Sequence, residues 1–157
     1  MQDQPVNLVQ ILEHAARFYG NTEIVTRRVE NGKIERSNYK NLMRLSKQLA
    51  NALQKLGVQF GDRVATMAWN SERHLESWYA VTGQGAICHT INPRLFEGQI
   101  DYIINHAEDK VMMIDPPFVP ILEPLQVRFP SIEHYIVLTD DEHMRRRLCT
   151  MLLPTSL

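Results

Sequence analysis

Cysteine, long apolar runs and an excess of either charge are all scarce in this sequence of 157 residues. The 2 cysteines, Cys88 and Cys149, lack the Cys-x-x-Cys spacing of zinc and redox sites, and we expect no disulfide between them. No apolar run of about 18 residues and no secretion signal occur, so we expect a cytoplasmic protein without a stable membrane anchor. With 17 Lys and Arg against 18 Asp and Glu, the balance gives no electrostatic case for nucleic acid.

Motifs for phosphate and metal binding are missing as well. The closest glycines, Gly83 and Gly85, have no Lys or Ser/Thr at phosphate-loop spacing. The 6 histidines form no His-x-x-x-His pair, so the sequence predicts no metal site. Small molecules or proteins remain as the expected partners.

What the chain does contain is a regular alternation of amphipathic and apolar segments. Its 44% hydrophobic and 22% charged residues are typical of a folded domain. Asn31-Gly32 favours a tight type I′ turn between two short strands, at 23–29 and 33–37. The periodicity then predicts helices at 8–18, 38–56, 71–82, 96–106 and 121–127, and buried strands at 63–69, 86–91, 111–114 and 134–138.

Strands that are apolar on both faces and alternate with helices indicate a parallel sheet covered on both sides. The predicted fold class is therefore α/β, with a parallel sheet flanked by helices on both faces and a short N-terminal β-hairpin. No internal repeat interrupts this order.

Several polar and aromatic residues allow two interpretations. Trp69 and Trp78 fit either the core or the lining of an apolar pocket. His74 fits either an exposed imidazole or a general base. Asn92 follows the carboxyl end of a strand, where ligands of parallel sheets bind, but it also fits a cap for the next helix with Pro93 as its first residue.

Short stretches along the chain, taken in order, resemble one family. They are Tyr39-Lys40-Asn41-Leu42, Leu49-Ala50-Asn51-Ala52-Leu53, Leu56-Gly57-Val58, Gly61-Asp62-Arg63-Val64-Ala65, Asn70-Ser71, Gly83-Gln84-Gly85-Ala86 and Ile91-Asn92-Pro93-Arg94-Leu95. The series is similar to the amino-terminal part of AMP-forming acyl-CoA synthetases, over roughly residues 7 to 143. The run from Cys88 to Leu95 resembles the medium- and long-chain fatty-acid branch of this adenylate-forming superfamily.

The resemblance implies part of the N-terminal subdomain of the adenylate-forming fold. Complete relatives use ATP and Mg²⁺ to convert a fatty acid or related carboxylic acid to an acyl-adenylate, which coenzyme A then attacks. Their Ser/Thr/Gly-rich phosphate loop, aromatic-Thr-Glu motif, ribose-binding Asp and catalytic Lys have no match in this sequence.

We therefore expect the isolated chain to be inactive and to bind no cofactor, and we assign it no catalytic residue. The candidate acyl-pocket or scaffold positions are Trp69, Asn70, His74, Trp78 and Asn92. The alternative is a non-catalytic interaction or acyl-binding module that retains the fold.

The resemblance defines two segments, a partial N-terminal domain at 1–144 and a tail at 145–157 that does not resemble the family. The basic and apolar tail fits a solvated end, a membrane-touching segment, a nuclear-type patch or a shifted reading frame. One choice of codons for the tail, moved by one base, encodes a peptide that resembles the family again. A partial domain leaves apolar faces uncovered, so we expect a homo-oligomer.

Overall fold

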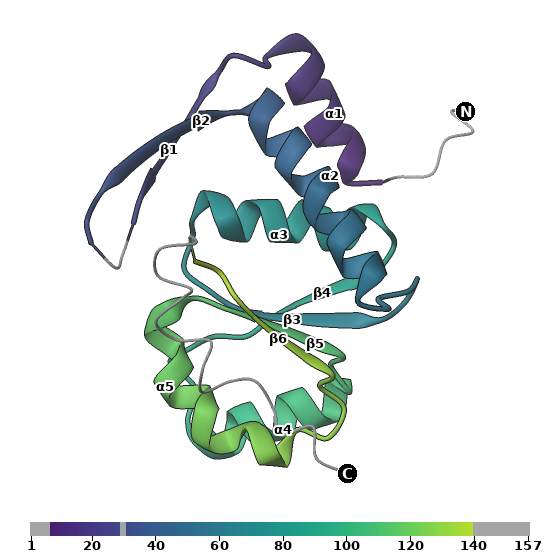
Figure 1. Ribbon diagram of the computed structural model, residues 1–157, viewed down its shortest axis with the longest axis vertical. Coiled ribbons are helices and arrows are strands. Elements are labelled where there is room, and N and C mark those ends of the chain that lie inside the picture. The colour runs from purple at the N-terminus through teal and green to yellow at the C-terminus, as the bar shows by residue number, and fades with distance from the viewer. Residues whose placement is uncertain (1–6, 29–30, 140–157) are drawn as a thin grey trace.

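A computed structural model describes residues 7–28 and 31–139 of the chain. Two layers of helices enclose a central sheet, and a hairpin extends beside the upper layer (Figure 1). The helices are α1 (Val9–Phe18), α2 (Tyr39–Lys55), α3 (Glu72–Gly83), α4 (Glu97–Ala107) and α5 (Val119–Leu122), with 3-10 turns η1 (Pro116–Phe118) and η2 (Glu123–Arg128) on either side of α5. The strands are β1 (Glu23–Arg27), β2 (Ile34–Asn38), β3 (Arg63–Met67), β4 (Ile87–Thr90), β5 (Val111–Ile114) and β6 (His134–Val137).

The central sheet has 4 strands in the order β4-β3-β5-β6, and each neighbouring pair is parallel. β3 lies opposite β4 with Val64 facing Cys88, and opposite β5 with Val64 facing Val111. All carboxyl ends therefore meet at one edge of the sheet. The prediction of a parallel sheet flanked by helices on both faces, with a short N-terminal hairpin, is confirmed.

Each face of the sheet has its own hydrophobic core. Val64, Val111 and Met113 face α2 and α3, where they meet Leu53 and Val81. Alternate residues face α4 and α5, and these include Ala65, Met67, Met112 and Ile114. Because strand side chains alternate between faces, a strand with apolar residues at every position can bury both sets. A large apolar side chain that is fully buried contributes about 1.5–3 kcal/mol.

Local capping chemistry sets the helix boundaries on the first face. The Asn38 side chain accepts a hydrogen bond from Asn41 N at 2.9 Å and begins α2. Ser71 does the same for His74 N at 3.2 Å and begins α3. Gly57 ends α2 with a φ of 84°, a left-handed conformation that favours glycine. The predicted starts of both helices are confirmed.

The hairpin forms, but its connection differs from the prediction. Arg27 lies opposite Ile34, and Arg28 N donates to Lys33 O at 2.8 Å, so the loop is longer than the predicted two-residue turn at Asn31-Gly32. Residues 29 and 30 lie outside the described residues. The hydrogen bond and ion pair between Arg28 and Glu35 stabilise this register, and they outweigh the preference of Asn31-Gly32 for a two-residue turn.

The segment after β5 also differs from the prediction. The sequence predicts a helix only at 121–127 in this segment. Instead the chain is helical through η1, α5 and η2, from Pro116 to Arg128. Proline is tolerated in the first turn of a helix because the N–H that it lacks has no partner there.

Candidate functional site

A pocket of about 490 Å³ opens beyond the carboxyl ends of β3 and β4. It forms there because parallel strands end at the same edge and the chain turns away from each strand into a helix. Four of the candidate residues, Trp69, Asn70, His74 and Asn92, line it together. The other lining residues are Ala68, Thr90, Ile91, Pro93 and Arg94.

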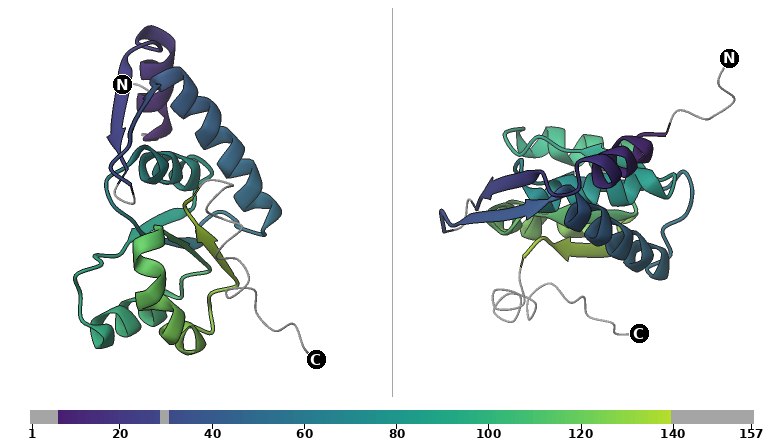
Figure 2. Two further views of the ribbon diagram at one scale, coloured as in Figure 1. Left: turned by 60° about the vertical axis from the view of Figure 1, so that its left-hand side comes forward. Right: turned by 90° about the horizontal axis from the view of Figure 1, so that it is seen from above.

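A second pocket, of about 410 Å³, lies between β1 and the first turns of α3. Trp78, the remaining candidate residue, lines it with Asn70 and His74, so the two pockets adjoin. The hairpin contributes Ile24 and Val25. Figures 1 and 2 show the hairpin running past the start of α3, which gives this pocket its outer wall.

His74 stands between the two pockets and is half-buried. Its Nε2 is hydrogen-bonded to Thr66 Oγ1 at 3.0 Å, so the interpretation of an exposed imidazole was wrong. Burial lowers the pKa of His74, and the charge of Asp115 and a hydrogen bond to the backbone of Trp69 oppose that shift. The position within α3 predicted exposure, but this helix presents its first turn to the end of β3.

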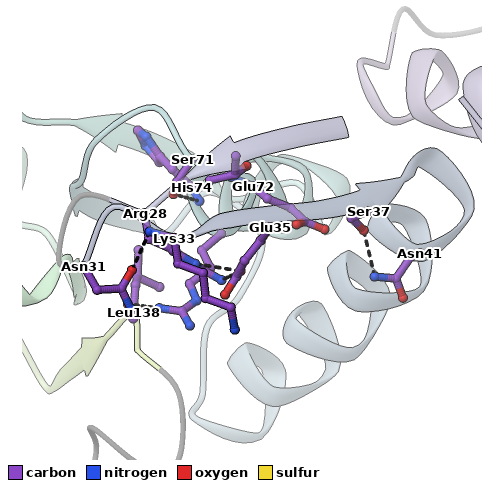
Figure 3. Close-up of polar contacts among 12 residues, drawn as sticks. Arg28, Asn31, Lys33, Glu35, Ser37, Asn41, Ser71, Glu72, His74 and Leu138 are labelled. Atoms are coloured by element: carbon purple, nitrogen blue, oxygen red, sulfur yellow. Dashed lines mark hydrogen bonds and ion pairs between the residues drawn. The ribbon is translucent and has the colours of Figure 1, made fainter. Parts of the chain in front are cut away.

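Polar contacts near the turn of the hairpin and at the start of α3 hold this region together (Figure 3). Ser71 and His74 lie at the start of α3, and Arg28 and Glu35 form an ion pair within the hairpin. Thr26, which is 5% exposed, accepts a hydrogen bond from Glu72 N at 3.0 Å. The hairpin therefore supplies a second cap for α3, and it fixes the helix that carries His74 and Trp78.

Asn92 lies at the pocket but does not cap a helix. Its side chain accepts a hydrogen bond from Arg94 N at 3.0 Å, and Leu95 N donates to its carbonyl at 3.2 Å. α4 begins later, at Glu97, so the interpretation in which Asn92 caps a helix that starts at Pro93 was wrong, whereas the predicted helix range of 96–106 agrees with α4. The Asn92 side chain accepts a hydrogen bond within its own turn, as asparagine often does outside helices.

Trp69 and Trp78 are both half-buried, so each fits the core interpretation in part and the pocket interpretation in part. The Trp69 ring lies 5.2 Å from the ring of Phe118 beside the lower core, while the residue also lines the first pocket. The Trp78 ring lies edge-on to Tyr79, 5.2 Å away, and the residue lines the second pocket. Each therefore has one side against protein and contributes to a pocket wall.

Sequence reasoning missed three residues that shape the pockets: Thr26, Thr66 and Asp115. Asp115 follows β5 directly and accepts a hydrogen bond from Trp69 N at 2.7 Å. A polar residue directly after a buried strand was the available signal for Asp115. Thr26 and Thr66 lie within strands, where the sequence gives no comparable signal.

The lining of the first pocket favours neutral or anionic groups. Arg94, His74 and two amide side chains line it, whereas none of the described residues that line it carries a carboxylate. Mg²⁺ prefers carboxylate oxygens, so this lining does not fit that ion. Across residues 7–28 and 31–139 there is no cluster of three or more His, Cys, Asp or Glu side chains that could hold a metal. In the same residues no helix combines the length and apolarity needed to cross a membrane.

Comparison with known proteins connects this fold to enzymes that act on carboxylic acids. The chain is 47% identical over 129 residues to a medium-chain-fatty-acid–CoA ligase of Ectopseudomonas oleovorans, covering 82% of this chain and 23% of the relative. It is 41% identical over 140 residues to a long-chain-fatty-acid–CoA ligase of Thermus thermophilus, covering 89% and 26%. The chain thus spans about a quarter of the length of these relatives.

Solved structures agree with these relatives. An anthranilate CoA ligase in complex with anthranoyl-AMP superposes with a TM-score of 0.78 at 25% identity, over 93% of this chain and 29% of that one. A fatty acyl CoA synthetase of Mycobacterium tuberculosis shares the fold, with a TM-score of 0.73 at 22% identity, over 90% and 28%. The family model described as AMP-binding enzyme matches residues 12–150. The chain belongs to this family of AMP-binding enzymes.

Proposed function

We propose that this chain is the amino-terminal part of a cytoplasmic AMP-forming acid–CoA ligase for medium- or long-chain carboxylic acids. The identity of 47% to a medium-chain-fatty-acid–CoA ligase carries the proposal. In the complete enzyme, ATP with Mg²⁺ converts the carboxylate to an acyl-adenylate and pyrophosphate leaves. The thiol of coenzyme A then displaces AMP. Adenylation is needed because a carboxylate is a poor electrophile, whereas a mixed anhydride has a good leaving group.

The isolated chain is inactive in this proposal. The phosphate loop and the other ATP-binding motifs of the family have no counterpart in the sequence. Trp69, Asn70, His74, Trp78 and Asn92 act as pocket wall and scaffold, which their shared position in two adjoining pockets supports. Their role is to shape the site and not to transfer protons or groups.

Two exchange experiments test this proposal. The purified chain is assayed for ATP–pyrophosphate exchange with octanoate and palmitate, and we expect none. In a chimera, residues 7–139 replace the matching stretch of the Ectopseudomonas oleovorans ligase, and we expect octanoate-dependent exchange to persist. Exchange by the chain alone would contradict the assignment of an inactive part. A chimera that melts cooperatively but shows no exchange would contradict the proposed parent activity.

An acyl-binding module is the second candidate, and the lining of the pocket between β1 and α3 favours it. Ile24, Val25, Leu75 and Trp78 give that pocket a largely apolar wall. Apolar walls with a few polar groups are typical of small-molecule sites. Calorimetry with decanoate separates the two candidates. Saturable binding by the isolated chain supports a module, and its absence supports a scaffold that works only in the complete enzyme.

We also propose a boundary at residue 144, with 145–157 as a tail that does not belong to the family. These residues lie outside the described residues. The family match extends past the proposed boundary, to residue 150. Sequencing the gene beyond codon 157 tests the shifted frame. A phosphate-loop motif downstream in the other frame supports it, and the lack of one contradicts it.

A further inference from the structure

Asp115 lies where the chain leaves β5, at the carboxyl-terminal edge of the sheet. β3 leads into α3 on one face, whereas β5 leads into η1 and α5 on the other (Figure 1). The connections therefore diverge between these two neighbouring strands, at their carboxyl ends. Ligands of open parallel sheets bind at such a divergence. Asp115 comes directly after β5 at this point and is only 7% exposed.

The hydrogen bonds of Asp115 end the pairing of β3 with β5. Its backbone N donates to Met67 O at 3.0 Å, which is the last rung contributed by β3. Its side-chain Oδ2 then accepts from Trp69 N at 2.7 Å. A carboxylate thus takes the backbone donor of the residue two positions beyond β3. Hydrogen bonds to a charged acceptor are stronger than those between neutral groups, so this contact fixes where the chain leaves the sheet.

The segment that Asp115 holds leads directly into the pockets. Trp69 and Asn70 line the first pocket, and Ser71 then caps α3 by accepting from His74 N. His74 in turn contacts Thr66 Oγ1 on β3. The path from Asp115 to the imidazole is therefore a short chain of direct contacts within one corner of the fold.

Charge acts along the same path. Charged groups lie near His74 on several elements. Glu72 and Arg94 each line one of the two pockets that His74 also lines, and Asp115 accepts a hydrogen bond from the backbone N of Trp69. The negative charge of Asp115 raises the pKa of His74, against the lowering caused by burial. Asp115 thus favours the protonated imidazole while it holds the backbone beside it.

We propose that Asp115 is a positioning residue that fixes the backbone between Trp69 and Ser71 and thereby holds His74 at the pocket. The proposal rests on the proposed function only in treating Trp69 and His74 as parts of the working site. It assigns Asp115 no contact with substrate.

The test uses the full chain labelled with ¹⁵N and ¹³C, and needs no enzymatic activity. The imidazole of His74 is titrated by NMR from about pH 5 to 8, the range in which histidine changes charge. Its signals are assigned by their loss in His74→Gln. In Asp115→Asn, which keeps an acceptor but removes the charge, we expect the His74 midpoint to move to lower pH. A midpoint equal to that of the wild type would overturn the proposed connection between Asp115 and His74.

Asp62→Asn is the matched control. Asp62 lies just before β3, at the opposite edge of the sheet, where it accepts from Gln59 N at 2.8 Å and pairs with Lys110 at 3.1 Å. The variant loses the same charge, so we expect it to leave the His74 midpoint in place. An equal shift in both variants would show a general effect of net charge and would overturn the proposal.

Hydrogen exchange tests the backbone role. In Asp115→Ala we expect the Trp69 amide to exchange at least about tenfold faster, since losing a charge-assisted hydrogen bond costs about 1.4 kcal/mol or more. The Leu138 amide, which donates to Ile114 O at 2.8 Å at the same edge, is the internal reference. Equal acceleration at both amides would overturn the local role.

A titration of the wild type provides the test if the variants do not fold. The chemical shift of the Trp69 amide is followed with pH, and we expect it to change with the same midpoint as His74. A Trp69 amide shift that does not change at that midpoint would contradict the proposed connection.

Discussion

Glu76 on α3 is the residue whose replacement gives the clearest stability test of this fold. Burial raises its pKa from 4.5 to about 7, and the neighbouring carboxylate of Glu72 adds to the rise, although Arg73, Arg44 and Arg28 oppose it. A glutamate with a raised pKa destabilises the folded chain whenever it is ionised. Glutamine has nearly the same shape and no charge, so Glu76→Gln removes that cost.

The magnitude follows from the pKa change. At about 1.36 kcal/mol per pH unit, a change from 4.5 to about 7 corresponds to about 3.4 kcal/mol. Water still reaches part of this side chain, and screening reduces the figure to about 1–2 kcal/mol. Because the folded pKa is the higher one, the stability associated with Glu76 is fully present below pH 4.5 and is lost as the pH rises through about 7. Glu76→Gln should therefore match the wild type near pH 4.5 and exceed it near pH 8.

Urea unfolding followed by circular dichroism at both pH values measures the difference. Glu13→Gln, at an exposed position on α1, is the matched control and should change the free energy of unfolding by less than about 0.5 kcal/mol at either pH. A Glu76→Gln variant that is no more stable than the wild type at pH 8 would refute the reasoning. A gap that widens toward low pH would refute the assigned sign.

Three further predictions follow from the packing and the caps. Ser71→Ala removes the cap of α3 and should lower the free energy of unfolding by about 0.5–2 kcal/mol in urea titrations. Leu53→Ala, at a fully buried site between α2 and the sheet, should cost about 2–5 kcal/mol in the same assay, and a loss below 1 kcal/mol would contradict the assigned core. Light scattering at about 100 µM should detect a species larger than the monomer, because weak protein pairs still associate at that concentration. The large apolar side chains that support this association are strongly exposed, among them Ile11, Phe18, Phe60, Phe96 and Val127.

Much of the architecture could be predicted from the sequence, because its determinants are local. Asn38 and Ser71 mark the starts of α2 and α3, because their side chains accept hydrogen bonds from backbone N–H groups three residues later. The all-apolar strand at 111–114 indicates burial on both faces, which only a sheet covered by two layers provides. Each of these signals lies within a few residues of the feature that it determines.

Two of the errors concern contacts between elements, and the third concerns a local turn. Asn31-Gly32 favours a tight turn, but the register follows contacts made by Arg28 and Glu35. The third helical position predicted an exposed His74, but the imidazole meets Thr66 on the neighbouring strand. Asn92 has the chemistry of a helix cap, yet the chain makes a separate turn before α4 begins. At the hairpin and at His74 a contact between elements overrode the local preference, whereas at Asn92 a local turn replaced the expected helix cap.

The connection between β3 and α3 explains why residues that support the candidate site, Asp115 and Thr26, escaped prediction. Backbone N–H groups between a strand and a helix need partners when they are buried, and neither element supplies them. Asp115 accepts a hydrogen bond from Trp69 N, and Thr26 accepts one from Glu72 N. Each acceptor lies 46 residues from its donor in the sequence. The sequence therefore reveals the need for partners at this turn but not their source. Because one acceptor follows β5 and the other belongs to the hairpin, both sides of the fold contribute to the pockets around α3.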